Sequence, residues 1–145
     1  MTNMINSGKE LNKVKTVIVG CGLMAREHLK NMLLQLDTTE ISIVCEPSTV
    51  AYDEMCKVFA TFGLNPPPNE PNLDKLLSTY AKSLEAAFII TPHSLHYGQT
   101  KMCLEAGLDV LLEKPMVMNS VEAQDLVNTR NKTGKLLVIA FQGSL

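Results

Sequence analysis

A glycine-rich turn constrains this chain more than any other feature. It reads Gly20-Cys21-Gly22-Leu23-Met24-Ala25 and follows an apolar run that ends at Val19. Gly20 permits a tight turn, Gly22 lets backbone approach a pyrophosphate, and the small Ala25 lets the next helix pack closely on a sheet. The helix start, at Leu23 and Met24, presents N–H groups to the phosphates. Such turns also arise for geometric reasons alone, so the predicted nucleotide-phosphate cradle depends on two further features.

The first is an acidic residue at the end of the next apolar run. Glu46 follows residues 41–45 and lies about twenty residues beyond the glycines, where a carboxylate accepts hydrogen bonds from ribose hydroxyls. The alternative is an ordinary solvated glutamate. Pro47, Ser48 and Thr49 include no lysine or arginine, and a carboxylate here would repel a 2′-phosphate. We therefore expect NAD as the cofactor and consider NADP the less favoured one.

The second is the triplet Glu113-Lys114-Pro115, which follows the apolar run at residues 110–112. The carboxyl ends of strands are where an open α/β sheet binds its ligand. For Lys114 the alternative to a functional role is a salt bridge with Glu113 or a solvated loop.

These motifs, together with Thr91-Pro92 and His96, resemble the cofactor-binding half of the glucose-fructose oxidoreductase, inositol dehydrogenase and MocA family. The resemblance implies that the Thr91-Pro92 loop lies beside the nicotinamide. It also implies that Lys114 contacts both cofactor and substrate and is the catalytic residue of this half. His96, Glu113 and Pro115 join the expected cofactor site. In the family a second domain supplies a catalytic histidine, and we expect that this domain is absent here.

The resemblance further implies a function. The expected activity is hydride transfer between NAD and a carbinol carbon of a sugar, polyol or related substrate. The full-length protein would be an NAD-dependent dehydrogenase and a homo-oligomer, and the isolated chain would be inactive. Two alternatives use the same cradle: a regulator that senses nicotinamide without chemistry, and an NAD-dependent glycosidase with no net redox change. A methyltransferase would leave Thr91-Pro92 and Glu113-Lys114-Pro115 unexplained.

Composition limits the other classes of function. The 145 residues carry a formal net charge of −2, which offers no broad basic face for nucleic acid. The apolar runs are shorter than the roughly 20 residues that span a bilayer, and residues 1–13 lack the apolar centre of a signal peptide. We therefore expect a cytoplasmic protein without a membrane partner. The four cysteines form no C-x-x-C pair, so we expect buried thiols and no metal.

Strand and helix patterns alternate along the chain, which predicts a doubly wound α/β fold: a mostly parallel sheet in the Rossmann order 3-2-1-4-5-6 with helices on both faces. We expect a flexible arm at residues 1–12 and one dinucleotide-binding domain at 13–145. Apolar periodicity predicts helices near residues 23–36, 51–62, 73–80, 95–106 and 119–133. Asn119 and Glu122 form a candidate capping box, and residues 136–141 form the last expected strand.

One segment departs from the family pattern. Pro66, Pro67, Pro68 and Pro71 lie where the third strand is expected, and proline cannot donate to a sheet ladder. We therefore expect that strand to be vestigial, to lie on the sheet edge, or to be replaced by an extended loop.

Overall fold

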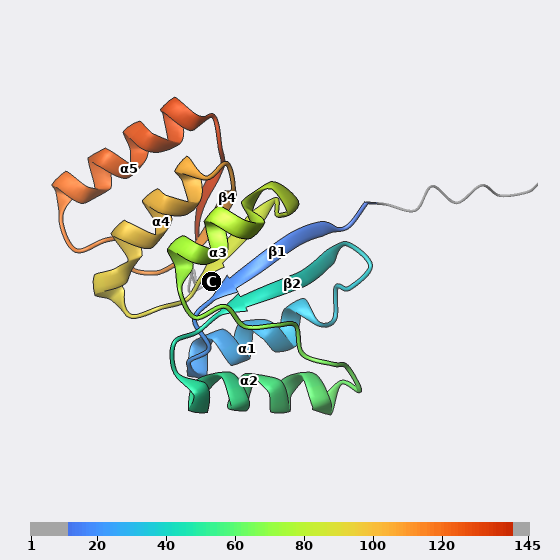
Figure 1. Cartoon of the computed structure of the whole chain (residues 1–145). Coiled ribbons are helices and arrows are strands. Elements are labelled where there is room, and N and C mark those ends of the chain that lie inside the picture. Colours follow the sequence, from blue (N-terminus) through green and yellow to red (C-terminus); the bar gives the residue numbers. More distant parts are fainter. Residues whose placement is uncertain (1–11, 141–145) are drawn as a thin grey trace, which may run out of the picture.

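The computed structural model describes residues 12–140, which form a parallel five-stranded sheet and five α-helices (Figure 1). The expected flexible arm falls almost entirely outside the described residues. The sheet has the order β2-β1-β3-β4-β5, and every neighbouring pair is parallel. The strands are β1 (Val14–Val19), β2 (Thr39–Cys45), β3 (Ala86–Ile89), β4 (Asp109–Glu113) and β5 (Leu137–Ala140). The helices are α1 (Leu23–Met32), α2 (Thr49–Thr61), α3 (Leu73–Tyr80), α4 (His96–Glu105) and α5 (Ser120–Thr133), with short 3-10 turns at Ala81–Ser83 and His93–Leu95.

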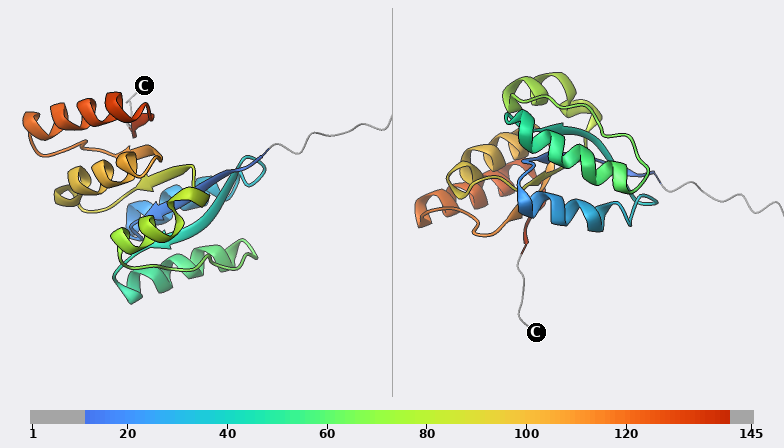
Figure 2. Two further views of the ribbon diagram at one scale, coloured as in Figure 1. Left: turned by 45° about the horizontal axis from the view of Figure 1, so that its top comes forward. Right: turned by 90° about the horizontal axis from the view of Figure 1, so that it is seen from below.

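Helices cover both faces of the sheet, as the alternating pattern predicts. Figures 1 and 2 show α1 and α2 on one side of the sheet and α3, α4 and α5 on the other. One buried cluster joins the sheet to α1 and α2 through Leu29, Met55 and Phe59. A second joins it to α3 and α4 through Leu76 and Leu104. The two clusters give the sheet a core on each face, which is the arrangement that holds a doubly wound fold together.

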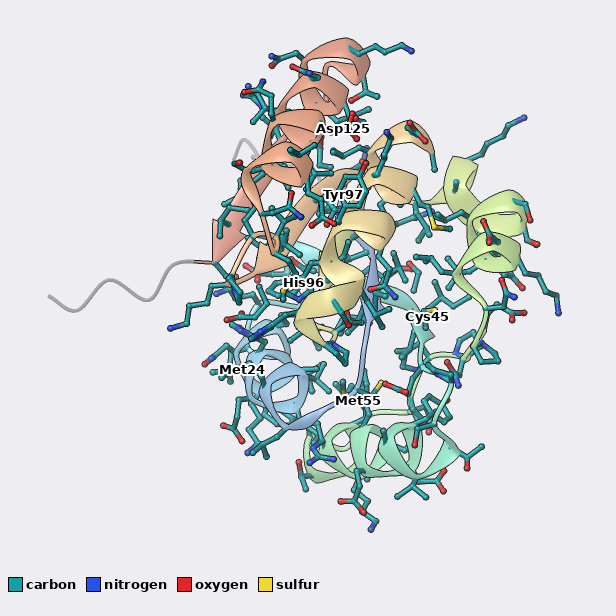
Figure 3. The ribbon with its side chains drawn as sticks, turned by 90° about the vertical axis from the view of Figure 1, so that its left-hand side faces the viewer. Met24, Cys45, Met55, His96, Tyr97 and Asp125 are labelled. Carbon is teal, nitrogen blue, oxygen red and sulfur yellow. The ribbon has the colours of Figure 1, made fainter. Side chains whose placement is uncertain are left out.

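Helix α5 packs against α4 and is tied to it by polar contacts (Figure 3). Tyr97 Oη and Lys101 Nζ of α4 both donate to Asp125 Oδ2 of α5, at 2.6 and 2.7 Å. These two hydrogen bonds hold the pKa of Asp125 below its usual value, and the bond from Lys101 has the larger effect. Hydrogen bonding to the charged form favours the carboxylate, so the contact is charge-assisted.

Helix ends agree with the sequence signals at some positions and differ at others. Helix α1 ends at Met32 instead of residue 36, because the chain turns toward β2 after the buried Leu33. Asn119 caps α5 by accepting from the Glu122 N–H at 2.9 Å. The reciprocal carboxylate contact reaches the Met118 N–H, one residue earlier than a capping box requires.

The apolar stripes also contain exceptions, which are corrections to the periodicity. In the last helix, Ala123, Leu126 and Val127 form an apolar stripe that predicts burial. Val127 is nevertheless 39% exposed, whereas the polar Thr129 is buried. Leu95 and Phe62 are likewise partly exposed, at 46% and 38%. Each lies at a helix end, where the chain leaves the packed layer. The last strand is described as far as Ala140, and Phe141, with which the sequence predicts that it ends, lies outside the described residues.

The proline-rich segment forms a vestigial third strand on the edge of the sheet. Its pairing with β2 is a single parallel bridge between Val44 and Asn69. The Val44 N–H donates to Pro68 O at 3.0 Å, and the Glu70 N–H donates to Val44 O at 2.9 Å. With this bridge counted in third place, the observed order matches the predicted 3-2-1-4-5-6. Proline explains the reduction, because Pro66, Pro67 and Pro68 have no N–H to offer a ladder.

The register of the strands places their carboxyl ends along one edge. Val19 pairs with both Cys45 and Ile89, and Ile89 pairs with Leu112. The loops that follow β2, β1, β3 and β4 therefore meet at this edge in that order.

No helix within residues 12–140 is long and apolar enough to cross a membrane.

Candidate dinucleotide site

The two glycines of the turn have different geometric roles. Gly20 has φ +101°, and a Cβ there would lie 2.3 Å from the carbonyl oxygen of Ile90. Only glycine fits this position, because both the torsion and the close approach of the neighbouring strand exclude a side chain. Gly22 has φ −66° and ψ −176°, and no atom lies within 4 Å of its would-be Cβ. The space beside Gly22 is open, as a cradle for a pyrophosphate requires.

Helix α1 begins directly after Gly22 and leaves its first turn available. Gly22 provides no side-chain cap, and the first helical bond runs from the Arg26 N–H to Gly22 O at 3.1 Å. The N–H groups of Leu23, Met24 and Ala25 precede that bond, at the positive end of the helix dipole. Ala25 is fully buried against the sheet, so the close helix packing predicted for a small residue is observed. These features suit an anion such as pyrophosphate.

Glu46 follows β2 and reaches back to the glycine turn. Its Oε2 accepts from the Cys21 N–H and its Oε1 from the Ser48 N–H, both at 2.8 Å. Its main chain forms two bonds with the side-chain amide of Asn69, each 2.9 Å long. Each carboxylate oxygen retains a lone pair for a further donor. The carboxylate is therefore held in one place while it remains able to accept from a ribose.

A buried histidine connects the two loops on the other side of the turn. His96 is 0% exposed; its Nε2 lies 2.9 Å from Thr91 O and its Nδ1 lies 2.7 Å from Pro115 O (Figure 3). Both partners are carbonyl oxygens, which only accept hydrogen bonds. The Thr91 hydroxyl in turn donates to Gln99 Oε1 at 2.6 Å. His96 thus bridges the loop after β3 to the loop after β4.

At the end of β4, Glu113 is buried and the next residue, Lys114, is exposed. Glu113 is 8% exposed and accepts from His28 Nε2 of α1 at 2.7 Å. The His28 ring also lies 5.3 Å from that of Phe88. Lys114 is exposed, and the described residues offer it no carboxylate partner, since Glu113 is engaged by His28. The salt bridge between Glu113 and Lys114 considered from the sequence is therefore not formed.

A cavity of about 670 Å³ joins these loops. Its size falls within the usual range for ligand sites. Ten of the predicted residues line it: Gly20, Gly22, Leu23, Met24, Ala25, Glu46, Thr91, Pro92, Glu113 and Lys114. His96 and Pro115 do not line it: the ring of His96 is fully buried, and Pro115 is exposed elsewhere on the loop. The cofactor contact expected of these two residues stays a prediction, and His93 lines the cavity.

Sequence reasoning missed several residues of this region. Gln99 and Leu73 line the cavity, and Asn69 and His28 hold residues that do. Gln99 lies one helical turn beyond the predicted helix start at residue 95, so that prediction could have suggested it. The contacts of Asn69 and His28 join positions far apart in the chain, and no local pattern signals them.

Other candidate sites are less suitable. A cavity of about 710 Å³ lies at the amino ends of the strands and is lined by charges of both signs, including Lys15 and Glu85. It contains no glycine turn or helix start. Burial raises the pKa of the Cys21 thiol to about 12, so this cysteine of the turn is an inert small side chain. Within residues 12–140 no group of three or more His, Cys, Asp or Glu side chains could hold a metal ion.

The glycine turn, the acidic residue after β2 and the cavity at the strand ends define a dinucleotide-binding Rossmann domain. A family model described as "Oxidoreductase family, NAD-binding Rossmann fold" matches residues 14–141. The chain therefore belongs to this family, GFO_IDH_MocA, and the resemblance inferred from the motifs is confirmed.

Relatives and solved structures agree with this assignment. The chain is 27% identical over 140 residues to scyllo-inositol 2-dehydrogenase (NADP(+)) IolW of Bacillus subtilis, covering 96% of this chain and 36% of the relative. It is 23% identical to D-glucoside 3-dehydrogenase of Escherichia coli, covering 94% and 37%. The WlbA dehydrogenase of Chromobacterium violaceum, solved with NADH and UDP-GlcNAcA, superimposes with a TM-score of 0.76 at 26% identity over 88% of this chain and 35% of that one. The chain thus spans about a third of the length of these proteins.

Proposed function

We propose that this chain is the NAD-binding part of an oxidoreductase that moves a hydride between NAD and a carbinol carbon of a sugar or polyol. The observation that carries the proposal is the sequence of groups along the sheet edge. The strand order places Glu46 first, then the glycine turn, then Thr91, then Lys114. This order matches a dinucleotide laid across the edge: adenosine ribose at the carboxylate, pyrophosphate at the turn, nicotinamide near Lys114.

The residues fit that cofactor. The open space beside Gly22 and the uncapped start of α1 would receive the pyrophosphate. Glu46 would accept from the ribose hydroxyls, and its carboxylate would repel a 2′-phosphate. Two unit charges about 4 Å apart repel by roughly 4 kcal/mol near a protein surface, before relaxation and screening. Even a fraction of that energy gives a tenfold preference for NAD over NADP.

Lys114 has the position and chemistry of a group that acts on substrate. NAD, when bound, supplies the hydride acceptor. The exposed ammonium of Lys114 would donate a hydrogen bond to the reacting hydroxyl and would stabilise the negative charge that develops on oxygen while a base, the histidine that the family's second domain supplies, takes the proton. Glu113 turns away toward His28, which leaves the ammonium free of a neighbouring carboxylate. The names of the relatives support sugars and inositols as the substrate class.

Two measurements test the proposal. The 145-residue chain should bind NADH more tightly than NADPH in calorimetric titrations and should show no dehydrogenase activity. Orientation of substrate against cofactor supplies about 7 to 11 kcal/mol of barrier reduction, and this chain spans only about a third of the length of its dehydrogenase relatives. In the full-length protein, Lys114→Ala should leave NADH affinity within several-fold and lower turnover of a sugar or polyol substrate by roughly 100-fold or more.

The matched control is Lys82→Ala, an exposed lysine before β3 at the opposite end of the strands. It should leave both NADH affinity and turnover unchanged. Equal, measurable turnover of wild type and Lys114→Ala would overturn the catalytic role, whereas NADH binding without turnover by the wild-type full-length protein would favour a nicotinamide sensor. Products without net oxidation would favour the glycosidase. Equal affinity for NADH and NADPH would overturn the role of Glu46.

A further inference from the structure

Asn69 holds Glu46 through the main chain. The Glu46 N–H donates to Asn69 Oδ1, and Asn69 Nδ2 donates to Glu46 O, each at 2.9 Å. A side-chain amide carries a donor and an acceptor on one plane, as a peptide group does. The amide of Asn69 therefore pairs with Glu46 as a neighbouring strand residue would, although the two residues lie 23 positions apart.

The pairing takes the place of backbone bonds at the end of β2. On this edge of β2 the backbone bonds stop at the bridge between Val44 and the segment at Pro68 and Glu70. Glu46 is two residues beyond Val44, where a longer third strand would continue to pair with it. The segment itself is anchored by the Tyr52 hydroxyl, which donates to Pro67 O at 2.7 Å. Asn69 thus extends the edge by one further pair.

We propose that Asn69 is a positioning residue that sets cofactor specificity by holding the Glu46 carboxylate at the ribose site. This inference rests on the ribose role of Glu46 proposed above. The carboxylate itself is held by the N–H groups of Cys21 in the glycine turn and of Ser48. Asn69 holds the main chain of the same residue. Without that second support, the residue after β2 gains freedom, and the carboxylate spends less time where it can accept from a ribose or repel a 2′-phosphate.

The test compares NADH and NADPH binding to the 145-residue chain. Asn69→Ala should weaken NADH binding by roughly 5- to 20-fold, as loss of one or two hydrogen bonds implies. NADPH binding should weaken less or improve, because the repelling carboxylate is less fixed. The NADH-to-NADPH affinity ratio should therefore fall by about the same factor. Purely structural damage would weaken both ligands alike and leave the ratio unchanged.

Asn72→Ala is the matched control. Asn72 lies three residues away, and its side chain also accepts from a backbone N–H, that of Lys75 at 3.0 Å, where it caps α3. This variant should lose a comparable amount of stability and keep the affinity ratio. If Asn69→Ala does not fold, Asn69→Asp provides the same test: it retains an acceptor for the Glu46 N–H and sets an oxygen against Glu46 O. Its ratio should fall as well.

A double-mutant cycle separates this inference from the function on which it rests. Asn69 contacts the main chain of residue 46, so its bonds survive in Glu46→Ala, which removes only the carboxylate. In that background Asn69→Ala should change the ratio by less than about 2-fold. If Glu46→Ala abolishes the NADH preference but Asn69→Ala and Asn69→Asp leave it intact, the positioning role is wrong and the ribose role stands. If Glu46→Ala leaves the preference intact, both are wrong.

Discussion

A side chain added at Gly20 should lower the stability of the domain, whereas one added at Gly22 should abolish NADH binding and leave stability nearly unchanged. In Gly20→Ala the new Cβ meets the Ile90 carbonyl oxygen at 2.3 Å, and residue 20 keeps φ near +101°. Such a torsion costs an L-residue about 1 to 3 kcal/mol, and forcing an atom into a packed site costs about 1 to 3 kcal/mol more. The free energy of unfolding should therefore fall by about 2 to 6 kcal/mol, a large part of a domain's total stability.

Gly22→Val should spare stability and abolish binding. The φ of −66° suits any residue, and no atom lies within 4 Å of the new Cβ. Valine is a poorer helix N-cap than glycine, so we expect a stability loss of about 1 kcal/mol or less. Its side chain, however, occupies the space in which pyrophosphate would meet the backbone. Loss of two charge-assisted hydrogen bonds, about 3 kcal/mol or more, weakens NADH binding at least about 100-fold.

Denaturant titration and calorimetry on the same samples measure both effects. Gly20→Ala should unfold at clearly lower denaturant concentration than wild type, and Gly22→Val should unfold within about 1 kcal/mol of it. At a temperature where both variants are folded, only Gly22→Val should lose NADH by steric exclusion. If Gly22→Val bound NADH normally, the pyrophosphate would lie elsewhere. If Gly20→Ala were as stable as wild type, the contact with Ile90 would not constrain the turn.

Three further predictions concern the residues that support the site. His28→Ala leaves the largely buried Glu113 without its donor, and we expect a loss of about 1 to 3 kcal/mol in the free energy of unfolding, measured by denaturant titration. His96→Phe removes both ring nitrogens that lie within hydrogen-bond distance of the carbonyl oxygens of Thr91 and Pro115; thermal melting and NADH titration should record lower stability together with weaker binding. Asp125 has a depressed pKa in the folded state, so its contribution to stability is present above its unfolded pKa and is lost as the pH falls through the lower, folded value. The stability difference between wild type and Asp125→Asn should therefore be constant at neutral pH and shrink as the pH falls below about 4, the ordinary pKa of an aspartate, and a difference that grew on acidification would contradict this sign.

Local signals predicted most of the fold. The apolar runs before Gly20 and Glu46 are strands β1 and β2, and the glycines at 63, 107 and 134 have positive φ just beyond the ends of α2, α4 and α5. These signals succeed because a helix stripe or a left-handed helix end depends on residues a few positions apart. They fail at Val127 and Leu95, whose exposure depends on how closely another layer packs over them.

The candidate site was likewise predicted in part by local signals and in part could not be. Ten predicted residues line one cavity because parallel strands that obey a common register must deliver their carboxyl-end loops to one edge. The pattern of residue types could not show that His93 lines the cavity while His96 is buried between two carbonyl oxygens, since both residues fall within one turn. Nor could it predict that Glu113 faces His28 rather than Lys114, a contact between residues 85 positions apart.

The sequence by itself determined the glycine turn, the strand and helix order, and the chemical groups at the strand ends, because each is written in neighbouring residues. Only the tertiary structure decided how those groups are held. Asn69 meets Glu46, His28 meets Glu113, and His96 joins Thr91 to Pro115 through contacts that exist only after the sheet has formed. Such contacts need a donor and an acceptor within about 3 Å, and distances of that kind between remote residues are a property of the packed chain.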